Sequence, residues 1–444
     1  MRVAYQAGVV RALAEAGLTF GHADGTSGGI LNLAMLLSGQ PPEEMCDRWV
    51  ELNVRDFVSL LPLHDYVRRP GPIALGGSDG VVDRVFPQLG IEVPRIRAAE
   101  GMQGTFNVCN FTRKTGEVWE HQRIERAMLL AGISLPIFMP PVPWNGSLYV
   151  DAVWLRDANL REAVRRGADE IWLVWCIGNS PAYHAGVFDQ YVHMIELSAN
   201  GSLFDELALI DERMRAGGPA VHLHVIRPEQ PLPLDPDLYL GRIDAATLVA
   251  MGYRDARTYL DTARPEGLPL TPEVTAMRDP APGVAMRQRL SGSLRWTAGG
   301  APDPVELELA ARLDGLAALG ADPARAWPLH GMLHLPRRRL RVFASAGGWR
   351  PRCGAVRRLT FRLPEGEARL VVRRGGAAEV VLAGRGAPLA TGRLGMGPLR
   401  LLAYATGVRT FGATSIRQRA RLLLRFWSAA LGRMMKRGGE SRGP

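Results

Sequence analysis

The sequence has almost no lysine: Lys114 and Lys436 are the only two, and all the other basic residues among its 54 are arginines. With 44 acidic residues, the formal net charge is +10. A positive charge of this size is compatible with binding to nucleic acid or to an anionic lipid surface, and also with binding to neither. Basic residues interleaved with aromatic ones, as in many nucleic-acid sites, occur only at the extreme C-terminus. We therefore expect no nucleic-acid partner and interpret most arginines as solvated surface.

Cysteine is also scarce. Cys46, Cys109, Cys176 and Cys353 lie far apart and form no C-x-x-C pair. This spacing argues against a metal site and gives no disulfide framework. The N-terminus lacks the pattern of a signal peptide, and no apolar run reaches the roughly 18 residues that a membrane span needs. The absences together predict a cytoplasmic protein.

The 444 residues are enough for two or three domains. Residues 1–263 alternate helical patterns with short apolar runs, which predicts an α/β layer fold with a mostly parallel sheet. Residues 264–285 are rich in proline and predict a linker. Residues 286–414 contain short alternating segments separated by Gly and Pro, typical of a small antiparallel barrel or sandwich. Residues 415–444 predict a basic amphipathic helix and tail.

The apolar stripe of this last helix has two interpretations, which the sequence does not separate. It either lies in the interface of an anionic membrane, with the arginines among the headgroups, or packs on the protein's own β domain. The arginines Arg417, Arg421 and Arg425 follow one side of the helix. The stripe consists of Ile416, Ala420, Leu423, Trp427, Leu431 and Met434.

Two segments match G-x-S-x-G, a pattern in which a strand, a tight turn and a helix expose a serine nucleophile. Ser27, in Gly25–Gly29, follows an apolar run and precedes an uninterrupted helical pattern. Ser78, in Gly76–Gly80, follows a short run that starts at proline, and we interpret Ser78 or Asp79 as the N-cap of a helix that starts there. Ser27 is therefore the candidate nucleophile, and an ordinary loop serine is the alternative.

A serine nucleophile needs a base. A Ser–acid–His order can be drawn to His222 or His224, but an α/β-hydrolase elbow follows several strands, and fewer than thirty residues precede Ser27. We interpret the two histidines as one face of a strand. Asp151 ends an apolar, strand-like stretch, and an aspartate there can accept the serine proton directly.

Five segments occur in the order found in the patatin-like phospholipases, which the chain resembles over residues 1–262. They are "MRVAYQAGVVRALAEAG", "GTSGG", "ISLPIFMPPVPWNGSLYVDAV", "NLREAVRRGADEIWLV" and "VIRPEQPLPLDPDLYLGRIDAATLVAMGYRDARTYL". The resemblance implies a three-layer sandwich and hydrolysis of lipid acyl esters by a Ser–Asp dyad, through an acyl-enzyme and without a metal or cofactor. It makes Ser27 the nucleophile and Asp151 the base, with the Gly28 N–H as an oxyanion donor and Arg2 as support for the oxyanion loop.

The chain departs from the family pattern in several places. The family's Gly-rich oxyanion motif and the strand before it would precede Met1, so we expect the true start to lie upstream. Ala152 replaces the glycine that usually follows the aspartate. The distance from Asp151 to Asn159 is longer than is usual in the family, which makes Asp157 the second candidate base, with a helix cap as its alternative role. The leading hypothesis is a lipid acyl hydrolase, peripheral to a membrane, acting on a lipid or acyl ester. The alternative is a catalytically impaired patatin-fold lipid-binding or scaffold protein. The oligomeric state is not indicated.

Aromatic and apolar residues near these candidates suggest a substrate groove. Phe138, Trp144 and Trp154 flank Asp151 in the sequence and are candidate pocket residues, although aromatic side chains are more often part of a core. Residues 55–75 are apolar, broken by proline and flanked by arginine. They predict a lid or groove wall, or else a buried loop.

Overall fold

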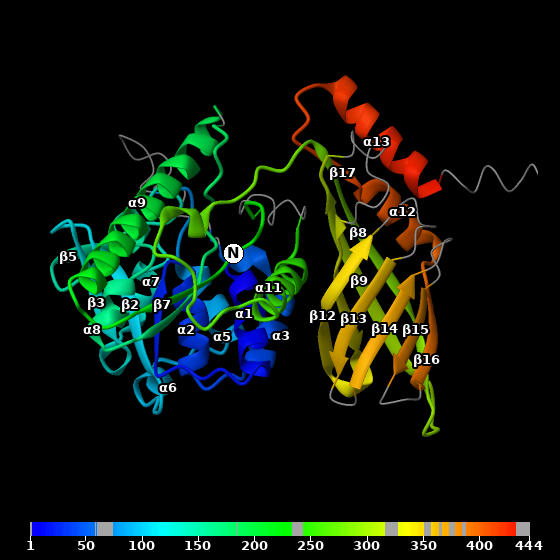
Figure 1. Ribbon diagram of the computed structural model, residues 1–444, viewed down its shortest axis with the longest axis horizontal. Helices are drawn as coiled ribbons and strands as arrows, with labels where there is room; N and C mark the ends of the chain where they lie inside the picture. Colours follow the sequence, from blue (N-terminus) through cyan, green and yellow to red (C-terminus); the bar gives the residue numbers. More distant parts are fainter. Residues whose placement is uncertain are drawn as a thin grey trace, which may run out of the picture. The chain divides into compact units, whose positions relative to one another are not determined.

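The chain divides into two compact units, Met1–Asp279 and Pro280–Pro444 (Figure 1). Within the described residues, no helix combines the length and apolar character that a membrane crossing needs. The computed structural model describes residues 2–57, 59, 74–183, 185–232, 243–315, 327–349, 357–363, 366–372, 378–383 and 388–431.

The first unit contains a mixed sheet and a separate pair of parallel strands. Strand β2 pairs in parallel with β1 and antiparallel with β3 and β5, and β5 also pairs with β4. Strands β6 and β7 pair in parallel. The predicted α/β sandwich is confirmed, with more antiparallel pairing than the sequence suggests. The strands are β1 (His22–Thr26), β2 (Gln103–Asn110), β3 (Thr115–Glu120), β4 (Val142–Trp144), β5 (Ser147–Asp151), β6 (Glu170–Val174) and β7 (His222–Ile226).

Local turn chemistry explains the antiparallel pairs. Asn145 and Gly146 join β4 to β5, and both have positive φ, at 44° and 77°. A two-residue hairpin turn of the type that matches strand twist requires this combination. The alternation of strand and helix patterns in the sequence does not predict this hairpin, because both of its short strands and its turn lie within one short stretch of the chain.

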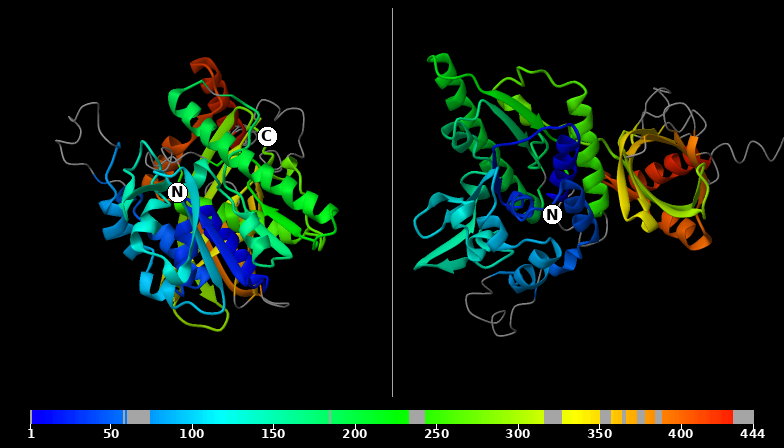
Figure 2. Two further views of the ribbon diagram at one scale, coloured as in Figure 1. Left: turned by 90° about the vertical axis from the view of Figure 1, so that its left-hand side faces the viewer. Right: turned by 90° about the horizontal axis from the view of Figure 1, so that it is seen from below.

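Helices cover the sheets in two groups (Figures 1 and 2). Helices α1, α2, α3 and α11 contact one another, while α8 and α9 share a core with β6 and β7. At the start of α11, the Asp244 carboxylate accepts a hydrogen bond from the Thr247 N–H at 2.8 Å, as a helix cap should. The helices are α1 (Ala4–Glu15), α2 (Gly29–Leu37), α3 (Pro42–Glu51), α5 (Phe86–Gln88), α6 (Val93–Arg97), α7 (Arg126–Ala131), α8 (Leu160–Arg165), α9 (Val187–Arg215) and α11 (Ala245–Leu260), with short turns η1 (Val54–Phe57), η2 (Val81–Val85), η3 (His121–Arg123), η4 (Ala152–Trp154) and η5 (Pro272–Thr275).

Helices α1 and α11 approach each other closely at two glycines. A Cβ atom at Gly8 would lie 2.0 Å from the Val249 carbonyl oxygen, and one at Gly252 would lie 1.9 Å from the Tyr5 carbonyl oxygen. No side chain fits at such distances, so glycine is required at both positions. The Tyr5 hydroxyl donates to the Asp255 carboxylate at 2.9 Å and adds a polar link across the same pair.

The predicted linker is partly structured. Turn η5 lies inside residues 264–285, and Val274 and Met277 are buried in the core that α9 contributes to. The Arg278 N–H also donates to the Glu229 carbonyl oxygen at 2.9 Å. Proline-rich composition is compatible with such a buried turn, because proline at its first positions sacrifices no intrahelical hydrogen bond. The division between the units therefore falls at residues 279 and 280, just before β8 begins at Gly283.

The second unit is a closed eight-stranded antiparallel barrel, which Figure 2 shows end-on. Each strand pairs with the next, β12 pairs with β13, and β16 returns to β8. The short strands β10 (Trp327–Pro328) and β17 (Arg409–Phe411) pair with β12 and β8. The turn η7 (Pro336–Arg338) joins β11 to β12. The barrel strands are β8 (Gly283–Trp296), β9 (Asp303–Leu313), β11 (His330–Leu335), β12 (Leu340–Trp349), β13 (Arg357–Leu363), β14 (Gly366–Val372), β15 (Ala378–Ala383) and β16 (Pro388–Gly395).

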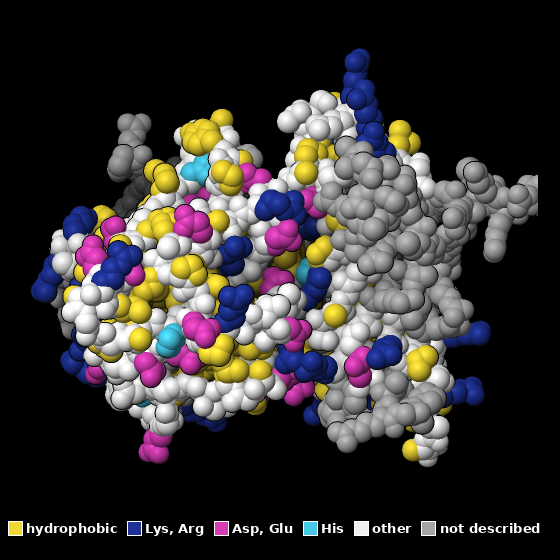
Figure 3. All heavy atoms as spheres, viewed as in Figure 1, with side chains coloured by type: hydrophobic (Ala, Val, Ile, Leu, Met, Phe, Trp, Pro, Cys, Tyr) yellow, Lys and Arg dark blue, Asp and Glu magenta, His cyan; other side chains and the backbone are white. Residues whose placement is uncertain are grey.

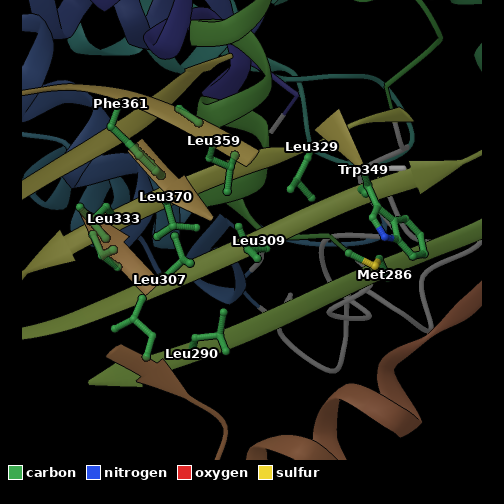
Figure 4. Packing of buried hydrophobic residues seen from close by; sticks show 14 of the residues in the cluster. Met286, Leu290, Leu307, Leu309, Leu329, Leu333, Trp349, Leu359, Phe361 and Leu370 are labelled. Atoms are coloured by element: carbon green, nitrogen blue, oxygen red, sulfur yellow. The ribbon is translucent and has the colours of Figure 1, made fainter. Parts of the chain in front are cut away.

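Apolar side chains fill the barrel (Figure 4). The period-two pattern of β9 explains how: alternate residues point inward and are buried, while the residues between them are more exposed. An eight-stranded barrel has an interior just wide enough for such side chains. The inward residues of β9 are Val305, Leu307, Leu309, Ala311 and Leu313.

Helix α13 (Ile416–Leu431) packs its apolar side on this barrel and on α12 (Pro398–Gly407). Leu422 and Phe426 are 4% and 0% exposed, and the Phe426 ring lies 5.6 Å from that of Trp349. Of the two interpretations of the stripe, the structure therefore supports packing on the β domain. The face of α13 that is buried differs from the predicted apolar stripe by a rotation of one residue around the helix axis. Leu423 and Trp427 of the predicted stripe are only half-buried, and Ile416 and Ala420 are exposed. The Leu431 side chain and Met434 lie outside the described residues.

Candidate functional site

Strand β2 brings the two candidate catalytic residues together. It pairs with β1 along its first half, where Thr26 lies opposite Asn107, and with β5 along its second half, where Asp151 lies opposite Val108. Because β1 is parallel to β2 and β5 is antiparallel, the two strands run toward each other and end at adjacent positions. Residues 124 apart in the chain therefore meet at one point of the sheet.

The segment Gly25–Gly29 forms a tight strand–turn–helix corner. Ser27 has φ of 51°, in the left-handed region that non-glycine residues seldom occupy and that nucleophile elbows use. A Cβ atom at Gly25 would lie 3.0 Å from the Gly29 carbonyl oxygen, and one at Gly28 would lie 2.3 Å from Val3 Cγ1. The small residues are therefore needed for the turn to close. Helix α2 begins at once, so the Gly28 and Gly29 N–H groups lie at its N-terminus.

Ser27 and Asp151 form a direct hydrogen bond. The Ser27 hydroxyl donates to Asp151 Oδ2 at 2.7 Å, and the Val153 N–H donates to Oδ1 at 2.9 Å. Asp151 is fully buried, and its own N–H donates to the Ser134 carbonyl oxygen, while Ser27 is half-buried. The carboxylate is thus fixed in orientation with one oxygen directed at the hydroxyl. Ala152 opens the right-handed turn η4, so its position does not require glycine.

The environment of Asp151 suits proton transfer near neutral pH. Burial raises its pKa to about 7, and this rise is limited by the hydrogen bonds from Ser27 and the Val153 N–H. A general base works best when its pKa lies near the working pH. Burial, and then the charge of Asp151, raise the pKa of Tyr191 to about 12, which keeps the phenol neutral.

Asp157 and Arg2 do not take part in the hydrogen bond between Ser27 and Asp151. Ser27 donates to Asp151 and not to Asp157. Desolvation, and then the charge of Asp151, raise the pKa of Asp157 to about 8, while the positive charge of Arg2 lowers it. Arg2 is therefore close enough to act on Asp157. Its support of an oxyanion loop stays a prediction.

A buried polar network supports the elbow from β2. The Asn107 amide donates to the Thr26 hydroxyl at 2.9 Å and to the Asp24 carboxylate, and the Asn159 amide donates to Asn107 Oδ1 at 2.9 Å. The Thr105 hydroxyl also donates to Asp24. Burial raises the pKa of Asp24 to about 7. Reasoning from the sequence missed these residues; the available signal was the polar Asn107 between the apolar Phe106 and Val108.

Aromatic side chains form one wall near Asp151. The Tyr191 ring makes edge contacts with Phe138 at 5.4 Å and with Trp154 at 5.6 Å, and its hydroxyl donates to the Pro136 carbonyl oxygen. The candidates Phe138 and Trp154 are thus brought together by a residue of α9. Trp144 lies on β4. Most of the predicted lid, residues 58 and 60–73, lies outside the described residues.

The remaining candidates have structural surroundings. His224 stacks on Trp172 at 4.2 Å and hydrogen-bonds the Tyr259 hydroxyl, while His222 bonds the Glu266 carbonyl oxygen. Both histidines belong to β7, as the strand interpretation expects. Ser78 directly precedes a helical segment, and its carbonyl oxygen accepts the Val81 N–H at 3.1 Å.

The fold and this site define an α/β unit of the lipid acyl hydrolase class. Residues 1–164 match the family model described as patatin-like phospholipase. The match identifies a patatin-like phospholipase domain over these residues, which include Ser27, Gly28, Asp151 and Asp157. No curated protein matches the sequence.

Proposed function

We propose that the N-terminal unit is a serine lipid acyl hydrolase, of the phospholipase A or lipase type, with Ser27 and Asp151 as its catalytic dyad. The observation that supports the proposal best is the 2.7 Å hydrogen bond from an elbow serine with positive φ to a fully buried carboxylate. The strained backbone holds the hydroxyl at the helix N-terminus, and the burial gives the carboxylate a pKa of about 7.

The reaction proceeds in two halves. Ser27 Oγ attacks the carbonyl carbon of the ester while its proton passes to Asp151 Oδ2, and the Gly28 N–H, at the start of α2, stabilises the oxyanion. Collapse of the tetrahedral intermediate breaks the ester C–O bond, and the leaving alcohol takes the proton from Asp151. A water molecule then attacks the acyl-enzyme, again with Asp151 as the base, and releases the fatty acid and free Ser27.

The wall formed by Phe138, Trp154 and Tyr191 gives this chemistry an apolar neighbour. Trp154 belongs to the turn that directly follows Asp151, and the Tyr191 ring contacts both Trp154 and Phe138, so the three rings lie near the reacting atoms. Aromatic surface of this kind binds an acyl chain by removing apolar area from water. We therefore assign the acyl side of the substrate to this wall.

A fluorophosphonate probe, which reacts with activated serines, tests the proposal. Labelling is expected in the wild type and in Ser78→Ala, the matched control for a serine in a second G-x-S-x-G. It should disappear in Ser27→Ala and slow about 100-fold or more in Asp151→Asn, because the general base is lost. Equal labelling of Ser27→Ala and the wild type would refute the assignment. No labelling of any variant would instead favour a catalytically impaired patatin-fold lipid-binding or scaffold protein.

A further inference from the structure

Helices α12 and α13 together form an exposed surface on the barrel unit. The Tyr404 ring of α12 meets the Trp427 ring of α13 at 5.8 Å, which holds the two helices side by side. We call their outward side the helical surface, and define it by Leu399, Leu402, Arg417, Arg421, Leu424 and Arg425, all of which are exposed.

This part of the chain is strongly basic. Between Val380 and Gly439 the sequence has eleven basic residues and no acidic residue. Arg417, Arg421 and Arg425 follow one another at intervals of four along α13, and none of them forms an ion pair with any residue that the structure describes. Figure 3 shows basic side chains projecting from the exposed side of α13. The helical surface therefore presents positive charge that the described fold does not neutralise.

The same surface exposes large apolar side chains. Leu399 is 83% exposed, Leu402 61% and Leu424 67%. These leucines do not serve the barrel core, because Leu422, Phe426 and Tyr404 fill that role from the opposite sides of the two helices. Exposed leucines grouped beside unpaired arginines are a common feature of interaction surfaces.

We propose that the helical surface docks on an anionic lipid bilayer. The arginines contact lipid phosphates, and the leucines enter the boundary between headgroups and acyl chains. A single-stranded nucleic acid fits less well, because it needs exposed aromatic rings for base stacking, and here the Phe426 and Trp427 rings contact Trp349 and Tyr404. The docking face lies away from the buried residues Leu422 and Phe426, and it differs from the apolar stripe that the sequence predicts. The proposal concerns the second unit and does not depend on hydrolysis by the first.

Cosedimentation of the full-length chain with vesicles tests the proposal, in a Ser27→Ala background so that the lipid is not consumed. Phosphatidylcholine vesicles with about 30 mol% phosphatidylglycerol should bind the protein, and pure phosphatidylcholine vesicles should not. The triple variant R417Q/R421Q/R425Q should weaken the partition coefficient about 100-fold, since each basic residue near an anionic surface contributes about fivefold. The variant L399S/L402S should weaken it about tenfold.

The matched controls remove the same number of arginines, or the same number of exposed leucines, from the first unit. R123Q/R213Q/R264Q replaces three exposed arginines, and L148S/L209S replaces two exposed leucines. Both controls should change binding less than about twofold, and circular dichroism should show that every variant is folded. Equal binding to both vesicle types, or control variants that weaken binding as much as the surface variants, would overturn the proposal. The proposal would also be overturned if the protein bound no vesicles but bound DNA, and if the triple arginine variant lost that DNA binding.

Discussion

The pKa of Asp151 leads to a specific prediction for the pH dependence of the reaction with Ser27. Only the ionised carboxylate can accept the serine proton, and burial raises its pKa to about 7. At pH 5, two units below that value, about one carboxyl group in a hundred is ionised. The rate of fluorophosphonate labelling, or kcat/KM for a short-chain ester, should therefore rise about 100-fold from pH 5 to pH 9, with an apparent pKa near 7. A solvated aspartate with a pKa near 3.9 would give a rate that is almost flat over the same range.

The measurement needs two controls. Circular dichroism should show that the protein stays folded at every pH, and Asp151→Asn, which keeps the shape of the side chain but has no proton acceptor to titrate, should show a low rate without this rise. A flat profile for the wild type would refute the reasoning, because it would mean that the base is ionised at pH 5. A profile of the same shape in Asp151→Asn would assign the titration to another group.

Three further predictions concern the framework of the site. Gly252→Ala should lower the free energy of unfolding, measured by urea denaturation, by about 3 kcal/mol, because the new Cβ atom would overlap the Tyr5 carbonyl oxygen. The control Gly201→Ala, on an open side of α9, should be neutral or stabilising by up to about 1 kcal/mol. Asp24→Asn should flatten the dependence of the unfolding free energy on pH. The pKa of Asp24 is raised to about 7 in the fold, so the wild type loses stability as the pH rises from about 4 to 7. The expected loss is about 2 kcal/mol, because the group is half-buried. A wild type and an Asp24→Asn variant with parallel stability–pH curves would contradict this. Asn107→Ala should destabilise the first unit by about 1–3 kcal/mol and slow the labelling of Ser27, because the Asp24 carboxylate and the Thr26 hydroxyl each lose a hydrogen-bond donor. Loss of stability with unchanged labelling would show that the network does not position the elbow.

The sequence predicts the local parts of the site better than the connections between them. The glycines of the elbow and the helix after it are local signals, and the structure has α2 where the helical pattern places it. The strand before the elbow is different: the apolar pattern predicts residues 18–23, whereas β1 spans His22–Thr26. A polar Asp24 interrupts the pattern, and it is accepted in the strand because Asn107 and Thr105 donate to it from β2. Those partners are distant in the chain, so the local pattern cannot show them.

The same limit applies to the second unit. Its alternating segments predict strands, but whether they form a sandwich or a barrel depends on the pairing of β12 with β13 and of β16 with β8, which periodicity does not encode. In α13, three successive leucines, Leu422 to Leu424, allow several apolar stripes. The rings of Trp349 and Tyr404 decide between them, because each one contacts a different aromatic residue of the helix.

Strand β2 explains why the dyad and its supporting network occur at the same place. Asn107 and Val108 are successive residues, so their side chains point to opposite faces of the sheet. At Asn107, β2 pairs with the end of β1, and the Asn107 amide donates a hydrogen bond to Thr26, the residue before Ser27. At Val108, β2 pairs with Asp151 of β5. Changing the register of β5 by one residue would turn the Asp151 side chain to the other face, away from Ser27. The catalytic distance is therefore a property of strand register, and substitutions in β2 that leave both dyad residues intact should still affect the reaction.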